Sequence, residues 1–144
     1  MKRTMIVLLL LLSHSAQANN CLLCGEWISN EQMTLESMNK SGQVTKKQRD
    51  LFSKNFFGKL KLIYTQHKVT TFYAGETTVA GYTLTQNQKS GYTIKFSDDA
   101  ISSSGQEIWF TNNHQCYYSV IGNLHFNEYF CKTKTASWAQ SLAK

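Results

Sequence analysis

The 144-residue sequence contains no proline and has few acidic residues. Proline is the residue that most strongly interrupts strands and helices, so its absence suits long, continuous elements joined by glycine and asparagine turns. Threonine, tyrosine and phenylalanine are plentiful, and these residues favour strands. No apolar run reaches the roughly 20 residues that a membrane-spanning helix needs. These absences leave one mainly β domain as the simplest expectation.

The longest apolar run, Ile6 to Leu12, lies close to the start of the chain. Lys2 and Arg3 precede it, and a small-residue Ala-x-Ala site ending at Ala18 follows it. This order is typical of a secretory signal peptide, whereas a membrane anchor would need a longer run. We expect residues 1–18 to be removed, which leaves a mature chain of 126 residues that begins at Asn19, one domain in length. The protein is therefore predicted to be periplasmic or secreted.

The net charge does not indicate a particular class of partner. Fifteen lysines and arginines, less Lys2 and Arg3, against nine acidic residues give the mature chain a net charge of +4. The basic residues are scattered among acidic ones, and a solvated surface explains them as well as an anionic partner does. With export and so mild a charge, we expect no binding of nucleic acid.

From Lys59 onward, apolar and polar residues alternate, and turn residues interrupt the pattern at short intervals. The short gaps favour hairpins between successive strands. An eighth strand is expected before them, at Gly25 to Ser29. The seven strands predicted from the alternation are Lys59 to Thr65, Lys68 to Tyr73, Val79 to Thr85, Tyr92 to Ser97, Gln106 to Thr111, Gln115 to Ile121 and Leu124 to Lys132.

Helical signals separate the first strand from the others. Asn30 is a candidate N-cap for a helix through Met38, and Thr45 with Gln48 forms a capping-box pattern ahead of a second helix that runs to about Phe57. A last short helix is expected from Ser137 to Ala143. In the second helix, four apolar residues are expected to share one face: Val44, Leu51, Phe52 and Phe56.

Eight strands in sequential order favour closure into an up-and-down antiparallel barrel, because closure removes the exposed edges. Gly25-Glu26-Trp27 on the first strand resembles the Gly-x-Trp of the lipocalins, and the helix pair after it resembles the lid of the fatty-acid-binding proteins. The chain therefore resembles the calycins in architecture over nearly all of its mature length. The resemblance implies that Trp27 is buried at the base or wall. The chain departs from the fatty-acid-binding proteins in strand number and from the lipocalins in the position of its helices. Arg49 is the only arginine of the mature chain.

The four cysteines are predicted to converge at one end of the barrel. An even number in an exported chain favours two disulfides, of which three pairings exist. Cys116 faces Cys131 across the last hairpin if the hairpin is centred on residues 123 and 124, so we favour this pair and then Cys21 with Cys24.

Two functional readings of the cysteine end remain as minor alternatives. The Cys21 to Cys24 spacing is that of a redox motif, but no strand-to-helix turn follows it to lower a thiol pKa. His67, His114 and Cys116 fall at the same end and would suit zinc or copper. Because export favours disulfides first, we expect no metal and no cofactor.

The candidate ligand site combines the lid with the barrel interior. Arg49, Phe52 and Phe56 would border a mouth at the helix end, and the interior tyrosines would supply hydroxyl groups. Glu128 faces inward if Tyr117 and Phe130 do, with a raised pKa, and otherwise faces outward beside a lysine. The predicted ligand-binding residues are Arg49, Phe52, Phe56, Tyr64, Tyr82, Tyr92 and Glu128.

We expect a monomeric binding protein that takes an apolar or amphipathic small molecule. The alternative is a periplasmic inhibitor or immunity-type protein that binds a partner protein through its loops. Enzyme activity is not expected, since no nucleophile with a base, metal-ligand motif or phosphate loop stands out. Lysines 46, 47 and 54 on the second helix form either a solvated face or a contact with an anionic membrane surface.

Overall fold

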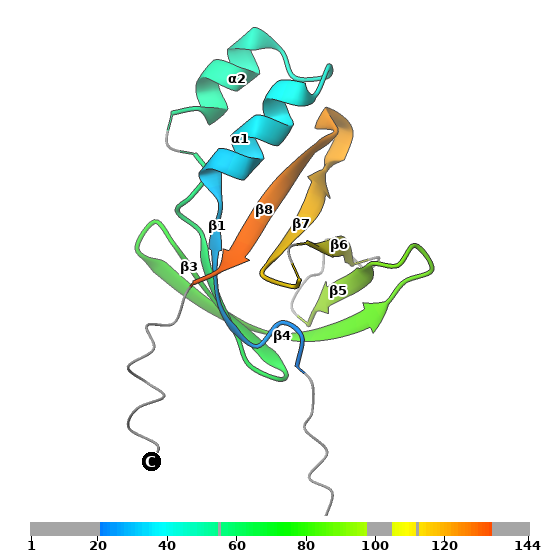
Figure 1. Ribbon diagram of the computed structural model, residues 1–144. Helices are drawn as coiled ribbons and strands as arrows, with labels where there is room; N and C mark the ends of the chain where they lie inside the picture. Colours follow the sequence, from blue (N-terminus) through cyan, green and yellow to red (C-terminus); the bar gives the residue numbers. More distant parts are fainter. Residues whose placement is uncertain (1–20, 55, 98–104, 112, 134–144) are drawn as a thin grey trace, which may run out of the picture.

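Each strand pairs with its neighbours in sequence, and the last strand pairs with the first to close an antiparallel barrel of eight strands. The computed structural model describes residues 21–54, 56–97, 105–111 and 113–133 (Figure 1). The mainly β fold with a helix pair after the first strand is therefore confirmed. In chain order the elements are β1 (Gly25–Ser29), α1 (Glu31–Lys40), α2 (Lys46–Phe52), β2 (Lys61–Tyr64), β3 (Lys68–Tyr73), β4 (Glu76–Gln86), β5 (Tyr92–Phe96), β6 (Gln106–Thr111), β7 (Cys116–Ile121), the short 3-10 helix η1 (Gly122–Leu124) and β8 (Phe126–Lys132).

Strands β1, β3 and β6 have the bounds that the alternation predicts. Strand β4 begins at Glu76 instead of Val79, because it pairs with β3 as far as the turn at Ala74 and Gly75. The predicted signal peptide, the predicted helix from Ser137 to Ala143 and the loop 98–104 lie outside the described residues. Within the described part of the chain, no helix has both the length and the apolar character needed to cross a bilayer.

The two helices start where their capping residues predict. The Asn30 side chain accepts a hydrogen bond from the Met33 N–H, and α1 runs two residues beyond Met38. Thr45 and Gln48 form the reciprocal capping box at the start of α2. The prediction that α2 reaches about Phe57 is wrong: α2 ends at Phe52, and Phe57 leaves the helix to be buried.

The main core fills the barrel. Its centre is Trp27, which is fully buried, and the inward residues of the other strands pack around it. The interior residues predicted from the alternation all belong to this core or pack against it. They are Leu60, Leu62, Tyr64, Tyr82, Leu84, Tyr92, Ile94, Phe96, Ile108 and Phe110.

Helix α1 completes the wall where β1 is too short to do so. Strand β1 pairs with β8 only opposite Phe130 to Lys132. Farther along β8, the backbone N–H groups of Asn127 and Tyr129 donate to the hydroxyls of Ser37 and Thr34 on α1, at 2.8 and 3.0 Å. Side-chain hydroxyls thus take the place of a strand partner and satisfy buried backbone donors.

Candidate functional site

The end of the barrel where β1 begins is called the base here. Before β1, the Cys21–Cys24 disulfide closes a tight turn in which the Cys24 N–H donates to the Cys21 carbonyl at 3.2 Å. This turn inserts Leu23 into the barrel, where it is fully buried. The indole N–H of Trp27 donates to the Leu23 carbonyl at 2.6 Å. Residues 21–24 therefore form a plug that closes part of the base.

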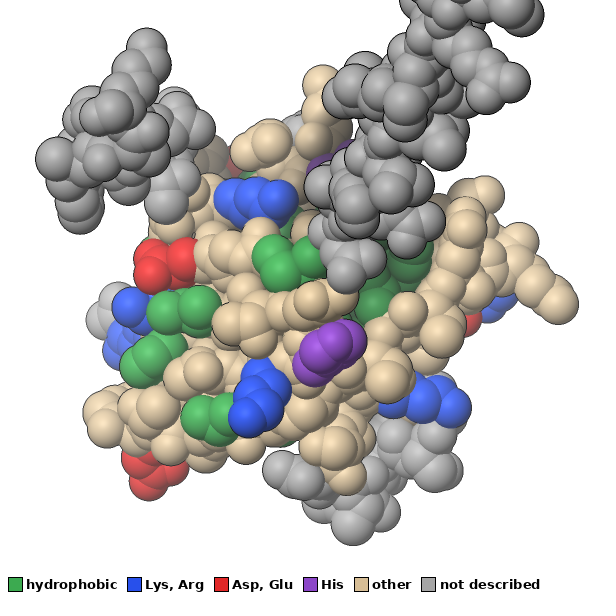
Figure 2. Space-filling model, turned by 90° about the horizontal axis from the view of Figure 1, so that it is seen from below, with side chains coloured by type: hydrophobic (Ala, Val, Ile, Leu, Met, Phe, Trp, Pro, Cys, Tyr) green, Lys and Arg blue, Asp and Glu red, His purple; other side chains and the backbone are tan. Residues whose placement is uncertain are grey.

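Beside the plug lies a half-open hollow of about 430 Å³, called the base hollow from here on. Small-molecule sites usually measure about 300–1,000 Å³, so the base hollow is at the small end of that range. Figure 2 looks onto this end and shows hydrophobic side chains at the surface near its centre. The base hollow is lined by Cys21, Leu22, Gln66, His67, Tyr82, Thr83, Leu84 and Tyr92.

Tyrosine hydroxyls lead from the base hollow into the core. The Tyr82 hydroxyl donates to the Thr65 carbonyl at 2.8 Å, and its ring meets the Tyr64 ring edge-on, with the ring centroids 5.1 Å apart. Behind them, the hydroxyls of Tyr64 and Tyr117 are 3.4 Å apart. Tyr82 thus has its polar atom at the rim and its ring against the core.

Burial raises the pKa values of these three tyrosines. It raises the pKa of Tyr64 to about 12, although the hydrogen bond with Tyr117 partly offsets the rise. Burial also raises the pKa of Tyr82, and it raises the pKa of Tyr117 well above the usual value of a tyrosine. Of these three tyrosines, Tyr82 lines the base hollow, and its raised pKa keeps its hydroxyl a hydrogen-bonding group at physiological pH.

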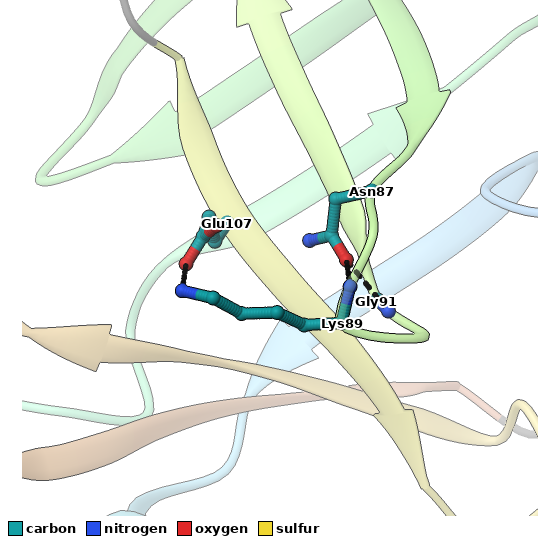
Figure 3. A network of polar contacts seen from close by, with 4 residues as sticks. All are labelled: Asn87, Lys89, Gly91 and Glu107. Atoms are coloured by element: carbon teal, nitrogen blue, oxygen red, sulfur yellow. Dashed lines mark hydrogen bonds and ion pairs between the residues drawn. The ribbon is translucent and has the colours of Figure 1, made fainter.

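The turn between β4 and β5 fixes another part of the base (Figure 3). The Asn87 carboxamide oxygen accepts from the N–H groups of Lys89 and Gly91, both at 2.9 Å. Lys89 also pairs with Glu107 on β6 at 3.6 Å. The Asn87 amide nitrogen is buried and has no hydrogen-bond partner within the described ranges. This turn leads directly into Tyr92, which lines the base hollow.

Glu128 lies on the inner face of β8, away from the base. It stands opposite Ser119, which is buried, and Ser119 accepts a hydrogen bond from the Gln106 side chain at 2.9 Å. Burial raises the pKa of Glu128. Of the two orientations considered, the inward one is therefore the one found, and the outward glutamate paired with a lysine is not.

The predicted lid face is split between core and solvent. Phe52 packs against Phe57 and Phe126, with ring centroids 5.8 and 6.2 Å apart. Leu51 is 63% exposed and Phe56 is 49% exposed, so neither is buried on a common face with Phe52. The expectation of one shared apolar face on α2 is wrong, because the chain turns after Phe52 to bury Phe57 in a second core. That core joins Met38, Val44, Phe57 and Phe126.

The structure therefore brings together only some of the predicted ligand-binding residues. Tyr82 and Tyr92 line the base hollow, and Tyr64 lies directly behind Tyr82. Arg49, Phe52 and Phe56 lie on or after α2, on the far side of the fold, and Glu128 lies on a third part of the barrel. The sequence reading missed Leu22, Leu23 and Gln66, and it considered His67 only as a candidate metal ligand at this end. The two leucines between paired cysteines were the available signal for an inserted turn.

Both predicted disulfides are present. Cys21 pairs with Cys24, and Cys116 pairs with Cys131 across the last hairpin in the predicted register. His67 lines the base hollow, whereas the His114 ring packs against Phe110, with the ring centroids 4.9 Å apart. Where the structure describes the chain, no three side chains of His, Cys, Asp and Glu are grouped as metal ligands would be.

Comparison with known proteins gives two distant structural matches. No protein-family model matches the sequence, and no curated protein matches it. The crystal structure of Zn(II)-bound AdcA from Streptococcus pneumoniae aligns with 85% of this chain at 12% identity and a TM-score of 0.40. The Zn(II)-bound ZinT-like domain of AdcA aligns with 85% of this chain and 87% of that chain, at 11% identity and a TM-score of 0.38. The chain spans about a third, 34%, of the AdcA chain. The strand pairing of this chain by itself establishes the eight-stranded antiparallel barrel, and the likeness to calycins stays a prediction.

Proposed function

We propose that the protein binds a small amphipathic molecule in the base hollow. The observation that carries this proposal is the composition of the wall: Leu22, Leu84 and the Tyr92 ring supply apolar surface. Gln66, His67 and Tyr82 supply polar groups at the rim. A few convergent polar groups on a mainly apolar wall are the usual make-up of a small-molecule site.

The site proposed here differs in place from the one expected at the helix end. There the described side chains of α1, α2 and β8 pack as the second core. The base hollow is half-open and bordered by the plug, so we propose a compact ligand with one hydrogen-bonding group. Two disulfides are consistent with an oxidising compartment, which supports a role in the periplasm or outside the cell.

The test is a fluorescence titration with anilinonaphthalene sulfonate, an amphipathic dye of compact shape. We expect saturable binding, and we expect Leu22→Ser and Tyr92→Ala each to weaken it by about tenfold, because each removes apolar wall. Val120→Ser is the matched control, since Val120 is 46% exposed on β7 and does not line the base hollow. Absence of saturable binding, or an equal loss in Val120→Ser, would contradict the proposal.

One observation favours a second function, the binding of a partner protein. The barrel interior is packed with aromatic side chains, and the turn between β3 and β4 carries Tyr73, which is 45% exposed. Lys59 and Lys61 lie beside this turn around a shallow hollow of about 370 Å³. If the dye does not bind, capture of a host protein that Tyr73→Ala abolishes, and Val79→Ser does not, would support this function instead.

A further inference from the structure

Helix α2 presents an unusual surface for so short an element. None of its residues is buried, and Leu51 points outward with 63% of its surface exposed. Four residues after α2 ends, Phe56 is 49% exposed. Two large apolar side chains, five residues apart in the sequence, are thus left exposed at the helix end of a small domain, and exposed apolar groups that form a patch mark interaction sites.

Phe56 is held in place by the second core, and Leu51 by the fixed start of α2. The Phe56 ring meets the rings of Phe52 and Phe57 edge-on, with centroids 5.1 and 5.0 Å apart. The capping box fixes the start of α2, where the Gln48 N–H donates to the Thr45 hydroxyl at 3.3 Å and the Thr45 N–H donates to the Gln48 side chain at 2.9 Å. The exposed apolar surface is therefore presented by packed neighbours.

Basic side chains surround Leu51. A shallow hollow of about 570 Å³ is lined by Lys46, Lys47, Lys54 and Leu51. Asp50 is the one acidic residue that lines it. Neither of the ion pairs found in the described part of the chain involves these lysines, since they join Lys61 to Glu26 and Lys89 to Glu107. An exposed leucine bordered by three lysines, followed by an exposed phenylalanine after the same helix, is complementary to the head groups and acyl boundary of an anionic bilayer.

The position of α2 fits such a contact. Strand β1 begins at the base and ends at Ser29, where the chain enters α1, so the helix pair lies at the other end of the barrel from the base hollow (Figure 1). A surface that contacts α2 leaves the base hollow open to water. Docking by α2 and binding in the base hollow are thus independent of one another.

We propose that α2 and Phe56 dock the protein on an anionic phospholipid surface. Leu51 and Phe56 enter the head-group boundary, and Lys46, Lys47 and Lys54 face the lipid phosphates. This interaction is separate from the small-molecule site and does not rest on it.

The experiment is co-sedimentation of the mature, disulfide-bonded protein with vesicles of phosphatidylglycerol and phosphatidylethanolamine, compared with vesicles of phosphatidylcholine alone. We expect partition into the anionic vesicles that falls as salt is added. The double variant Leu51→Ser, Phe56→Ser is expected to lower partition by about tenfold. Replacing Lys46, Lys47 and Lys54 by Gln is expected to lower it by roughly a hundredfold.

Val79→Ser is the matched control, because Val79 is 57% exposed on β4, away from α2. Circular dichroism confirms that each variant is folded, and the Leu22→Ser variant shows whether the base hollow takes part. Failure of the wild-type protein to partition into anionic vesicles would overturn the proposal. The same failure is the result expected if the true partner is an acidic protein. Unchanged partition in the double variant, or an equal loss in Val79→Ser, would also overturn it.

Discussion

Trp27 is the residue at which the plug meets the barrel. Its ring is fully buried between Tyr117 and Phe110, with ring centroids 4.9 and 6.1 Å away, and its indole N–H holds the Leu23 carbonyl. One side chain thus ties residues 21–24 to the interior of the strands. The Gly-x-Trp resemblance implied burial of this ring, and the structure shows what the ring contacts.

We predict that Trp27→Ala destabilises the protein by about 3–5 kcal/mol, because it leaves a large cavity and an unpaired buried carbonyl. Trp27→Phe retains most of the ring volume and is expected to cost less than half as much. Urea unfolding followed by circular dichroism measures both. A cost below about 0.5 kcal/mol for Trp27→Ala would place the ring in a surface environment and contradict the structure.

Glu128 makes the stability of the fold depend on pH. Burial raises its pKa in the folded state, so the folded protein keeps the proton over a pH range in which the unfolded chain has already lost it. The free energy of unfolding therefore falls as the pH rises from the unfolded pKa to the folded pKa, and levels off above that.

Glu128→Gln is expected to remove this fall and to raise the free energy of unfolding at neutral pH. Chemical unfolding at a series of pH values from about 4 upward, which begins near the ordinary pKa of glutamate, measures the effect. Glu76→Gln is the control, because Glu76 is an exposed residue of β4. A variant with the wild-type pH profile would show that Glu128 does not face the interior.

At the scale of elements, alternation predicted the strands well because each strand turns one face to the barrel interior and the other to solvent. Tyr64, Ile94 and Ile108 all point inward as their spacing indicates. The helix pair was harder to predict. Phe56 and Phe57 continue the apolar pattern of α2, but packing of Phe57 on Phe126 ends the helix early, and no local signal encodes that contact.

The plug is the element that sequence reading missed. A four-residue turn before the first strand has no periodicity, so only the paired cysteines around Leu22 and Leu23 marked it. The base hollow depends on this turn and on the β2–β3 turn, which are far apart in the sequence. The sequential strand order already predicted that both turns lie at one end of the barrel. The structure adds that they border a common hollow.

Helix α1 carries a prediction of its own, because its hydroxyls replace a strand partner for β8. Thr34 is fully buried and accepts from the Tyr129 N–H. Thr34→Val keeps the shape but leaves that donor unpaired, and we expect a loss of about 1–3 kcal/mol. Thr34→Ser keeps the hydroxyl and is expected to lose less. Equal losses in the two variants, measured by urea unfolding, would mean that methyl packing and not the hydrogen bond holds the seam.

At the scale of the whole molecule, the two ends of the barrel have different architectures. The base is closed by a disulfide-bonded turn beside an open hollow, whereas the helix end contains a second core that presents lysines and apolar groups on its outer side. A single small domain thereby carries two separate candidate surfaces.

The two disulfides should separate stability from binding. Cys116 and Cys131 are 15 residues apart, and their link should stabilise the fold by about 3 kcal/mol through the entropy of the unfolded chain. Cys21 and Cys24 are three residues apart, so their link constrains a much shorter loop, but it shapes the plug and one wall of the base hollow.

Replacing Cys116 and Cys131 by Ser is therefore expected to lower stability and leave dye affinity unchanged. Replacing Cys21 and Cys24 by Ser is expected to cost less stability and to weaken dye binding several-fold. Urea unfolding and dye titration on both variants, each with the remaining disulfide verified by intact mass, distinguish these effects. If the variant without Cys21 and Cys24 keeps wild-type dye affinity, the disulfide-bonded turn does not shape the ligand site.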